Sequence, residues 1–324
     1  MINNSFPHLS SIKIMTYNIH SCVGNDGKYS IDRIASVINS VSADIVCIQE
    51  VENNTSIGTV RKFSATHNDD QPSLLATKCG FEHIFFQSSL QACVSKKLSN
   101  NEILYHNSKY SYGNAILTKF AHLEKRVLHY APLDIPTTSE PYYIKMDSIE
   151  QPRIAQAVLL KLPTFGKIWI VNTHLSHKPW TLEPHRQVRK LLNWMNEISH
   201  GLPIILCGDL NVPPIIPYSA YSLIMRDTRF GIWRDSFLVQ KKIPYDSVTI
   251  PSSVYNNHHA KNKDSYILSY FKYISSMRID YILLLCPLNM TQFDVEKCTV
   301  VNSTKNSVIA SDHCPVVVLL RHLL

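Results

Sequence analysis

Short apolar runs recur along the chain, each too brief for an exposed helix and rich in Ile, Val and Tyr. Runs of this length and composition predict buried β-strands. We expect strands at IKIMTY (12–17), DIVCIQ (44–49), GNAILT (113–118), AQAVLLKL (155–162), KIWIVN (167–172), PIILCG (203–208), RIDYILLL (278–285) and PVVVLL (315–320).

Two segments between these runs follow a helical period instead. The segment SIDRIASVINSV (30–41) begins with Ser30, a suitable N-terminal cap. The segment TLEPHRQVRKLLNWMNEI (181–198) has one apolar face, made of Val188, Leu191, Leu192 and Met195. Strands that alternate with helices, and in places follow one another directly, predict an α/β fold with layered, mixed sheets.

Polar residues gather where the apolar runs stop. Four predicted strands end in side chains that bind metals or transfer protons, namely Asn18, Glu50, His174, and Asp209 with Asn211. Two more strands have such residues at their start, namely Asp280 and the pair Asp312 and His313. If these two strands run antiparallel to the other four, all of these side chains meet on one rim of the sheets. Each residue alone has a plain structural reading, such as a turn, but their joint placement predicts a reaction site.

Composition narrows the class of protein only slightly. The 324 residues are 45% apolar and 18% charged, which is enough to bury a sizeable core in one large domain or two average ones. Lys and Arg outnumber Asp and Glu by 32 to 25. The resulting net charge of +7 favours an anionic partner such as nucleic acid, a phosphorylated metabolite or an acidic lipid surface.

The cysteines and the apolar runs favour an intracellular protein. The eight cysteines show neither a CxxC pair nor zinc-ligand spacing, and Cys47 and Cys207 lie inside apolar runs. This pattern favours buried thiols over a disulfide framework. The first residues lack the pattern of a secretory signal, and no apolar run is long enough to span a bilayer. We therefore expect a soluble intracellular protein without a transmembrane segment, and a monomer.

No long flexible linker divides the chain. We expect an N-terminal tail over 1–11 and a single domain over 12–324, with surface insertions near 53–72, 129–152 and 252–277. The last insertion mixes Lys, His and aromatic residues, which suits stacking and charge contacts with a substrate. A solvated loop anchored by a few tyrosines is the simpler interpretation.

Seven short motifs follow one another along the chain: TYNIH, QEVE, YGNAILTK, VNTHLSH, ILCGDLNVPP, RIDYILL and SDHCPVV. In this order they resemble the endonuclease/exonuclease/phosphatase superfamily, from about Ile12 to Leu320. The resemblance implies an α/β fold, a four-layered sandwich of two mixed sheets packed face to face with helices outside. It also implies divalent-metal-dependent cleavage of a phosphate ester.

The resemblance implies a metal site built on Glu50. Asn18 would help to arrange this site, and Asp312 would lie close to the metal. Mg²⁺ keeps several of its waters and needs only one or two carboxylates, which suits such a sparse set of ligands. We expect Mg²⁺ as the cofactor, with Mn²⁺ as a substitute. Zinc is disfavoured because no group of His and Cys has the spacing of a zinc site.

The resemblance also implies catalytic roles. Asp209 would orient and deprotonate the attacking water, and Asn211 would position that water and the phosphate. His313 would donate to a phosphate oxygen, with Asp280 fixing the orientation of its ring. His174 would lie near the phosphate and the leaving group.

Other polar residues match the family less specifically. Asn114 and Arg153 lie beside strands, and for both we leave open a contact with phosphate and a purely structural role. His20, His177 and His185 are further candidate ligands, but surface or capping roles are favoured for all three.

The motifs leave the substrate open, because a shared fold supports many reactions. Inositol polyphosphate 5-phosphatases carry PAWCDR where this chain has SSMRID, which disfavours that branch. The ending SDHCPV is similar to that of abasic-site endonucleases, whereas the opening resembles unassigned hydrolases of the superfamily. We expect a phosphodiesterase acting on nucleic acid, ahead of a phospholipid or phosphoinositide phosphoesterase similar to sphingomyelinases. The alternative is a catalytically silent module that binds an anion or a partner, and retention of the polar set counts against it.

Overall fold

The computed structural model describes residues 11–54, 67–97, 103–130, 153–177, 182–240, 248–250, 277–287, 293–301, 304–305 and 308–322. Most of the three expected insertions, together with residues 1–10, lies outside these ranges. The structure differs from the expected bounds of the tail and the insertions at three places. Ser11 belongs to a strand, Gln71 and Pro72 are buried at the start of a helix, and Tyr130 is buried at the end of a strand.

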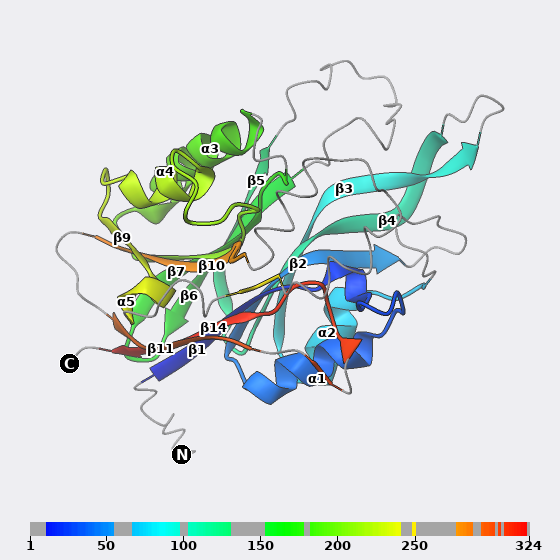
Figure 1. The fold of residues 1–324 in the computed structure, drawn as a ribbon, viewed down its shortest axis with the longest axis horizontal. Coiled ribbons are helices and arrows are strands. Elements are labelled where there is room, and N and C mark those ends of the chain that lie inside the picture. Colours follow the sequence, from blue (N-terminus) through cyan, green and yellow to red (C-terminus); the bar gives the residue numbers. More distant parts are fainter. Residues whose placement is uncertain are drawn as a thin grey trace.

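Two six-stranded sheets form the centre of the molecule (Figure 1). The strands of the first sheet, in spatial order, are β11 (Phe293–Val300), β14 (Val316–His322), β1 (Ser11–Asn18), β2 (Ile45–Asn54), β4 (Ile103–Thr118) and β3 (His83–Lys97). Those of the second sheet are β5 (His122–Tyr130), β6 (Arg153–Leu162), β7 (Gly166–His174), β8 (Ile204–Asp209), β10 (Asp280–Cys286) and β9 (Ile232–Asp235). A separate short pair consists of β12 (Thr304–Lys305) and β13 (Val308–Ile309).

Helices cover the outer faces of both sheets. The helical elements are η1 (His20–Cys22), α1 (Ile31–Val41), α2 (Gln71–Cys79), α3 (Glu183–Ser199), α4 (Ala220–Arg226) and α5 (Ser236–Val239). The pair α1 and α2 lies on the first sheet, and α3 and α4 lie on the second (Figure 1). Ser30 caps α1 by accepting a hydrogen bond from the Arg33 backbone N–H, as the sequence predicts.

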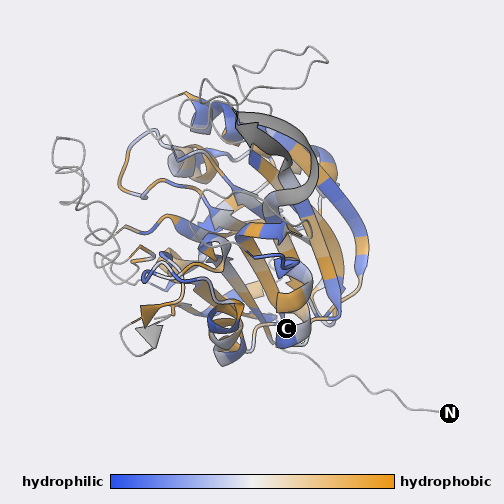
Figure 2. Ribbon diagram, turned by 90° about the vertical axis from the view of Figure 1, so that its right-hand side faces the viewer, coloured by the Kyte–Doolittle hydropathy of each residue, from blue (hydrophilic) through white to orange (hydrophobic). Residues whose placement is uncertain are grey.

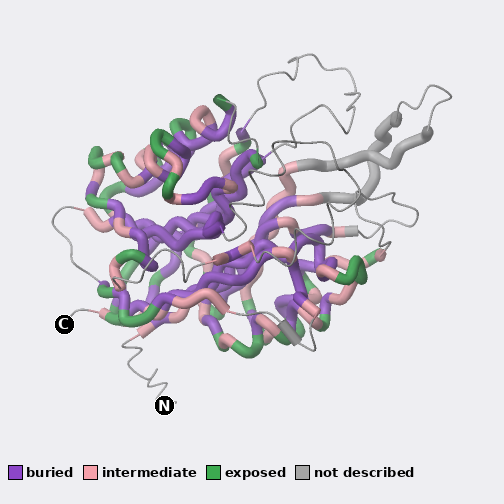
Figure 3. The backbone as a smooth tube through the Cα atoms, viewed as in Figure 1, coloured by how far each residue is buried: buried purple, intermediate pink, exposed green. Residues whose placement is uncertain are grey.

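Three apolar clusters define four layers. One cluster lies between the two sheets and contains Ile14 of β1 and Ile170 of β7. A second lies between the first sheet and α1 and α2, and it contains Met15, the next residue of β1. A third lies between the second sheet and α3, where Val188 packs. Both faces of the central strands are therefore buried (Figures 2 and 3), which explains why their sequences are continuous apolar runs. The predicted α/β sandwich is confirmed.

Strand directions bring the polar motifs together. The pairs β1 with β2 and β7 with β8 are parallel, whereas β10 runs antiparallel to β8 and β14 runs antiparallel to β1. The carboxyl ends of the four parallel strands therefore lie at the same rim as the start of β10 and the segment before β14. The cysteines whose side chains the structure describes carry free thiols, namely Cys22, Cys47, Cys79, Cys207, Cys286, Cys298 and Cys314.

Candidate active site

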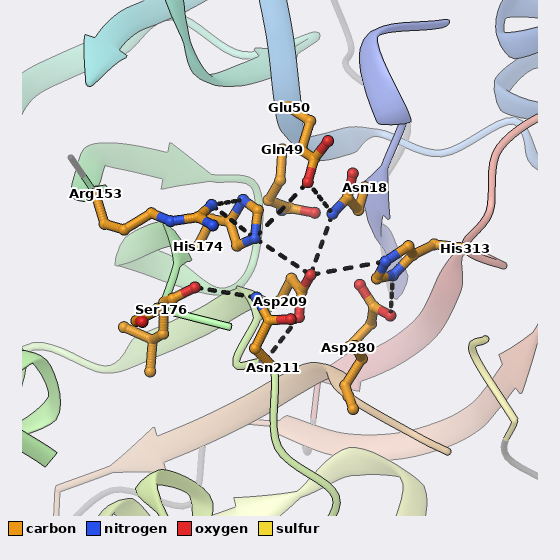
Figure 4. Close-up of polar contacts among 12 residues, drawn as sticks. Asn18, Gln49, Glu50, Arg153, His174, Ser176, Asp209, Asn211, Asp280 and His313 are labelled. Carbon is orange, nitrogen blue, oxygen red and sulfur yellow. Dashed lines mark hydrogen bonds and ion pairs between the residues drawn. The ribbon is translucent and has the colours of Figure 1, made fainter. Parts of the chain in front are cut away.

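Asn18, the last residue of β1, links side chains from both sheets. Its Nδ2 donates to Glu50 Oε1 at 3.3 Å and to Asp209 Oδ2 at 3.1 Å (Figure 4). Its Oδ1 accepts a hydrogen bond from the His20 backbone N–H at 3.1 Å. Because a backbone N–H can only donate, this last contact fixes which side of the amide faces the two carboxylates.

Glu50 reaches the site through a β-bulge. The register of β2 against β4 shifts between Ile48 and Val51, and Glu50 has a left-handed backbone with φ of 57°. Bulges of this kind redirect side chains and are frequent near active sites. The neighbouring Gln49 turns the other way and donates from Nε2 to Asn172 Oδ1 of β7 at 2.7 Å. The bulge therefore ties the two sheets together and also directs a carboxylate to the rim.

Asp209 ends β8 at a point where two strands approach closely. A Cβ atom on Gly208, whose φ is 143°, would lie 1.9 Å from the Thr173 carbonyl oxygen, so this position requires glycine. After the strand, the backbone N–H of Asn211 donates to Asp209 Oδ1 at 2.8 Å. The side chain of Asn211 donates to the Leu175 carbonyl at 3.0 Å. The GDLN motif thus fixes the Asp209 carboxylate from its own backbone.

Asp280 and His313 form a buried pair beside Asp209. Asp280 stands directly opposite Asp209 in the β8–β10 register, and its Oδ2 lies 2.8 Å from His313 Nδ1. The other ring nitrogen, Nε2, lies 3.9 Å from Asp209 Oδ2. Ser311 holds this corner to β1, since its hydroxyl donates to the Asn18 carbonyl at 2.7 Å and accepts from the His313 N–H at 3.2 Å.

A buried ion pair anchors the start of β10. Arg278 bonds Asp235 with both terminal nitrogens, at 2.9 and 2.6 Å, and both side chains are almost fully buried. The Tyr221 hydroxyl also donates to Asp235, at 2.9 Å. The guanidinium lies over the ring of Tyr281, 4.5 Å from its centroid. Asp280 therefore lies between Arg278 and Tyr281, whose side chains are both held by packing.

His174 and Arg153 form the opposite side of the site. His174 Nε2 lies 3.4 Å from Asp209 Oδ2 and 4.0 Å from Glu50 Oε1. Arg153 Nη1 lies 2.7 Å from Nδ1 and 2.8 Å from Nε2 of the His174 ring. Arg153 is 5% exposed, and its Nε has no hydrogen-bond partner among the described residues. The chain thus buries a guanidinium next to the carboxylates with part of its donor capacity unused.

The remaining candidates lie further from the Asp209 carboxylate. Asp312 Oδ1 is 4.0 Å from His313 Nε2 and 3.8 Å from His20 Nδ1, so Asp312 borders the site on the His313 side. Asn114 is buried, and its side chain donates to the Ile154 carbonyl at 3.4 Å, which is a structural contact next to Arg153.

The three additional histidines differ from one another. His177 is exposed, and His185 Nε2 contacts the Tyr218 carbonyl at 2.5 Å. His20 is only 7% exposed and lies beside Asp312, so a surface role is wrong for this residue. Its Nδ1 also lies 3.1 Å from the Val23 carbonyl, a local contact of the capping kind.

Burial and charge set the protonation of the two central groups. Burial raises the pKa of Asp209, and the neighbouring Asp280 carboxylate raises it further, against the opposing effect of His313. Burial by itself lowers the pKa of His313, but the surrounding carboxylates, first that of Asp280, raise it well above its usual range. His313 is therefore the charged donor of the pair.

The donor set fits a hard divalent cation. Ligand atoms of Asp209, Asp280 and His313 lie within 4.8 Å of one another, and Glu50 faces the same centre across Asn18. Asp280 Oδ1 is buried with no hydrogen-bond partner among the described residues. Carboxylate and amide oxygens are the ligands that Mg²⁺ and Mn²⁺ prefer, and a buried unpartnered carboxylate oxygen is costly without a cation or water.

Fold and site together define a two-sheet α/β sandwich with a buried centre of carboxylates, imidazoles and amides. The model of the Endonuclease/Exonuclease/phosphatase family matches residues 15–313, and the chain belongs to this family. Its members are generally hydrolytic phosphoesterases and typically use a divalent metal. Within the described residues, no helix has the length and apolar character needed to cross a bilayer.

The chain is also similar to several known proteins and solved structures. The chain is 23% identical over 207 residues to the uncharacterized protein YbhP of Escherichia coli, a match that covers 62% of this chain and 67% of YbhP. An endonuclease/exonuclease/phosphatase from Beutenbergia cavernae superposes with a TM-score of 0.65 at 25% identity, over 97% of this chain and 72% of that one. TDP2 from Caenorhabditis elegans gives a TM-score of 0.57 at 16% identity, over 96% and 97%. The similarity to TDP2 is one of fold alone.

Proposed function

We propose that this protein is a divalent-metal-dependent phosphodiesterase that cleaves a phosphate ester with an activated water, and that nucleic acid is its substrate. The observation that carries the proposal is the pairing of charges around Asp209. Arg153 lies buried against the ring of His174 on one side, and the charged His313 lies on the other with its Nε2 3.9 Å from Asp209 Oδ2. A phosphodiester carries a negative charge that repels nucleophiles, so the reaction needs positive groups at its oxygens.

Glu50 would hold the metal at the edge of this centre, with Asp312 close to it and Asn18 arranging the ligands. Bound Mg²⁺, or Mn²⁺ in its place, would supply positive charge to the phosphate oxygens and acidify water. Asn18 suits the arranging role because its Nδ2 donates to both the Glu50 and the Asp209 carboxylates, while its Oδ1 accepts from the His20 N–H. The bulge at Glu50 suits it as well, since it holds the carboxylate in a fixed direction.

Asp209 is the general base in this proposal. Its raised pKa brings a carboxylate closer to neutrality, where a base transfers protons more effectively. The Asn211 N–H holds one of its oxygens, and the Asn211 side chain, fixed by the Leu175 carbonyl, would position the water and the phosphate. His313, oriented by Asp280, donates through Nε2 to a phosphate oxygen. His174 and Arg153 contact the phosphate and the leaving group from the opposite side, while Asn114 supports the strand that carries Arg153.

A phospholipid substrate is the second candidate, and one observation favours it. Ile215 and Tyr218 follow Asn211 in a proline-rich loop and are each 72% exposed, and Leu182 at the start of α3 is 77% exposed. His185 joins α3 to this loop through the Tyr218 carbonyl. Rigid apolar side chains next to a site suit contact with acyl chains. The net charge of +7 suits either nucleic acid or an anionic lipid surface.

The decisive experiment measures hydrolysis of bis-p-nitrophenyl phosphate with Mg²⁺, Mn²⁺ or EDTA. We expect metal-dependent activity in the native protein and a loss of about 10²-fold or more in Asp209→Ala and His313→Ala. Asp32→Asn, a change on the exposed face of α1, is the matched control and should retain full activity. Equal activity in all four proteins, or none under any metal and with natural substrates, would leave only the silent binding module.

A second experiment identifies the substrate class. One preparation is assayed on abasic-site DNA, single-stranded DNA, RNA, sphingomyelin and phosphoinositides. We expect turnover of a nucleic acid, with Ile215→Ser/Tyr218→Ser unchanged on bis-p-nitrophenyl phosphate. Selective turnover of a lipid that is lost in this double variant would replace nucleic acid by the second candidate.

A further inference from the structure

An unusual turn follows Asn18. His20, Ser21 and Cys22 are three consecutive residues with left-handed backbone, at φ values of 46°, 51° and 61°, and none of them is glycine. A left-handed backbone is disfavoured at each such residue, because it brings the Cβ atom close to the following carbonyl oxygen. All three are buried. A turn of this kind persists only where the surrounding structure holds it in place.

The turn continues directly from the contact that orients Asn18. The peptide before His20, set by Ile19 at φ −94° and ψ 2°, brings the His20 backbone N–H back to Asn18 Oδ1, at 3.1 Å. With Oδ1 occupied, Nδ2 faces the Glu50 and Asp209 carboxylates. If the segment after His20 were no longer held in place, this N–H would lose the anchor that keeps it on the amide.

Gln71 clamps the turn to the strand that carries Glu50. Its Nε2 donates to the Ser21 carbonyl at 3.0 Å, and its Oε1 accepts from the Glu52 N–H at 2.8 Å. Both partners are backbone groups with fixed roles, so the amide has only one orientation that satisfies both. Gln71 is completely buried, and Glu52 follows Glu50 by two residues just beyond the bulge. One side chain therefore fixes the two segments whose ends meet at the metal site.

The surroundings of Gln71 keep this clamp closed. Asp69 donates its N–H to His67 Nδ1 at 3.2 Å. The other ring nitrogen, Nε2, lies 3.0 Å from Glu52 Oε2 and 3.0 Å from Gln71 Nε2. Tyr29 stacks on the His67 ring, with centroids 4.2 Å apart, and donates its hydroxyl to Asp69 at 2.6 Å. Gln71 is thus held at the first turn of α2 by a packed polar cluster that does not itself reach the carboxylates of the site.

We propose that Gln71 is a positioning residue for the metal site, acting through Asn18 and Glu50. This inference rests on the proposed metal-dependent function. Neutral buried amides suit the task, because a charged brace next to Glu50 would change the affinity for the cation directly. Residues that orient metal ligands typically alter metal affinity by about 10–100-fold when they are replaced.

The test measures Mn²⁺ binding by the electron paramagnetic resonance signal of free Mn²⁺, so that it does not depend on turnover. In Gln71→Met, which keeps the volume and loses both hydrogen bonds, we expect about 10-fold weaker binding. Leu75→Val is the matched control on the same helix, since it removes packing without touching Ser21 or Glu52. It should lower the unfolding temperature and leave Mn²⁺ affinity unchanged. Native affinity in a folded Gln71→Met would overturn the inference.

Two further variants separate the positioning role from general destabilisation. Gln71→Leu is also neutral and loses the same two hydrogen bonds, so it should also bind Mn²⁺ more weakly if it folds when Gln71→Met does not. In an Asn18→Ala background, Gln71→Met should cost less than it does in the native protein, because only the route through Glu50 remains. Fully additive losses would overturn the inference. Failure of the native protein to bind Mn²⁺ at all would instead overturn the proposed function.

Discussion

The two sheets present their site residues in different ways. The second sheet uses regular geometry, because Asp209 ends β8, Asp280 begins β10, and the two face each other in register. The first sheet uses irregular geometry, because Glu50 lies in a bulge with left-handed backbone and Asn18 precedes a left-handed turn. The supports differ in the same way. A buried ion pair between Arg278 and Asp235 anchors the second side, whereas the amides of Gln49 and Gln71 anchor the first, with the buried contact of His67 and Glu52 beside Gln71.

This difference matches the two tasks in the proposed mechanism. Proton transfer needs carboxylates and imidazoles whose pKa values are shifted, and closely packed strands supply both burial and neighbouring charge. Metal binding needs side chains that converge from several directions on one point, which regular strands cannot provide because alternate residues point to opposite faces. The irregular side therefore places ligands, and the regular side tunes acids and bases.

Replacing one carboxylate on each side of the site should have the largest effect on activity. Asp209→Asn removes the proposed base, so kcat should fall about 10²–10⁴-fold and stay low at any Mg²⁺ concentration. Glu50→Gln removes a proposed ligand, so its activity should recover in part as Mg²⁺ is raised. The measurement is hydrolysis of bis-p-nitrophenyl phosphate over a Mg²⁺ titration. If excess metal rescued Asp209→Asn and not Glu50→Gln, the two sides would have the opposite tasks.

The ion pair of the second side predicts the next largest effect, on stability. Arg278→Met leaves Asp235 buried without its charged partner, which should cost about 3–5 kcal/mol of unfolding free energy, measured with urea. The double variant Arg278→Met/Asp235→Leu should regain much of this loss, because no unpaired charge remains. A single variant as stable as the native protein would remove the contrast between charged and neutral supports.

The regular side was also the side that the sequence predicted well. The apolar runs gave the strands that bury both faces, and the polar residues at their ends identified Asp209, Asp280 and His313 as neighbours. The contact of Asp209 with Asp280 depends on strand direction alone, and a residue at the end of a strand is visible in the pattern. His313 lies before β14 of the first sheet, so its contact with Asp280 also depends on the packing of the two sheets.

The features that hold Glu50 and Asn18 in place on the irregular side were not predicted. The bulge at Glu50 and the left-handed turn at His20 leave no periodic signal, because their residues are not the glycines that usually mark such backbone. Gln71 was assigned to a surface insertion, since the segment before it is polar and α2 is short. Tertiary hydrogen bonds to Ser21 and Glu52 decide its position, and the local sequence does not encode them. The half-exposed strand β5 was missed for a related reason, because its charges interrupt the apolar pattern.

The raised pKa of Asp209 predicts a smaller effect that depends on pH. The native protein holds this proton more tightly than the unfolded chain, so its stability falls as pH rises from about 4 through the folded pKa. Asp209→Asn lacks this loss. We therefore compare the unfolding temperature of Asp209→Asn with that of the native protein, in EDTA. The difference, variant minus native, should be about 2 °C or more higher at pH 8 than at pH 5. A difference that is the same at both pH values would show that burial and Asp280 do not disfavour the charged form.

Backbone geometry at Glu50 predicts the smallest effect and tests the irregular side directly. Glu50→Gly and Glu50→Ala both remove the carboxylate, but only glycine adopts a φ of 57° without a Cβ penalty. The glycine variant should be more stable by about 1 kcal/mol in urea unfolding. Glu197, exposed within α3, provides the control, since alanine should be the more stable replacement there by about 1 kcal/mol. Alanine favoured at both positions would mean that the bulge carries no strain, and that the first sheet presents Glu50 as easily as the second presents Asp209.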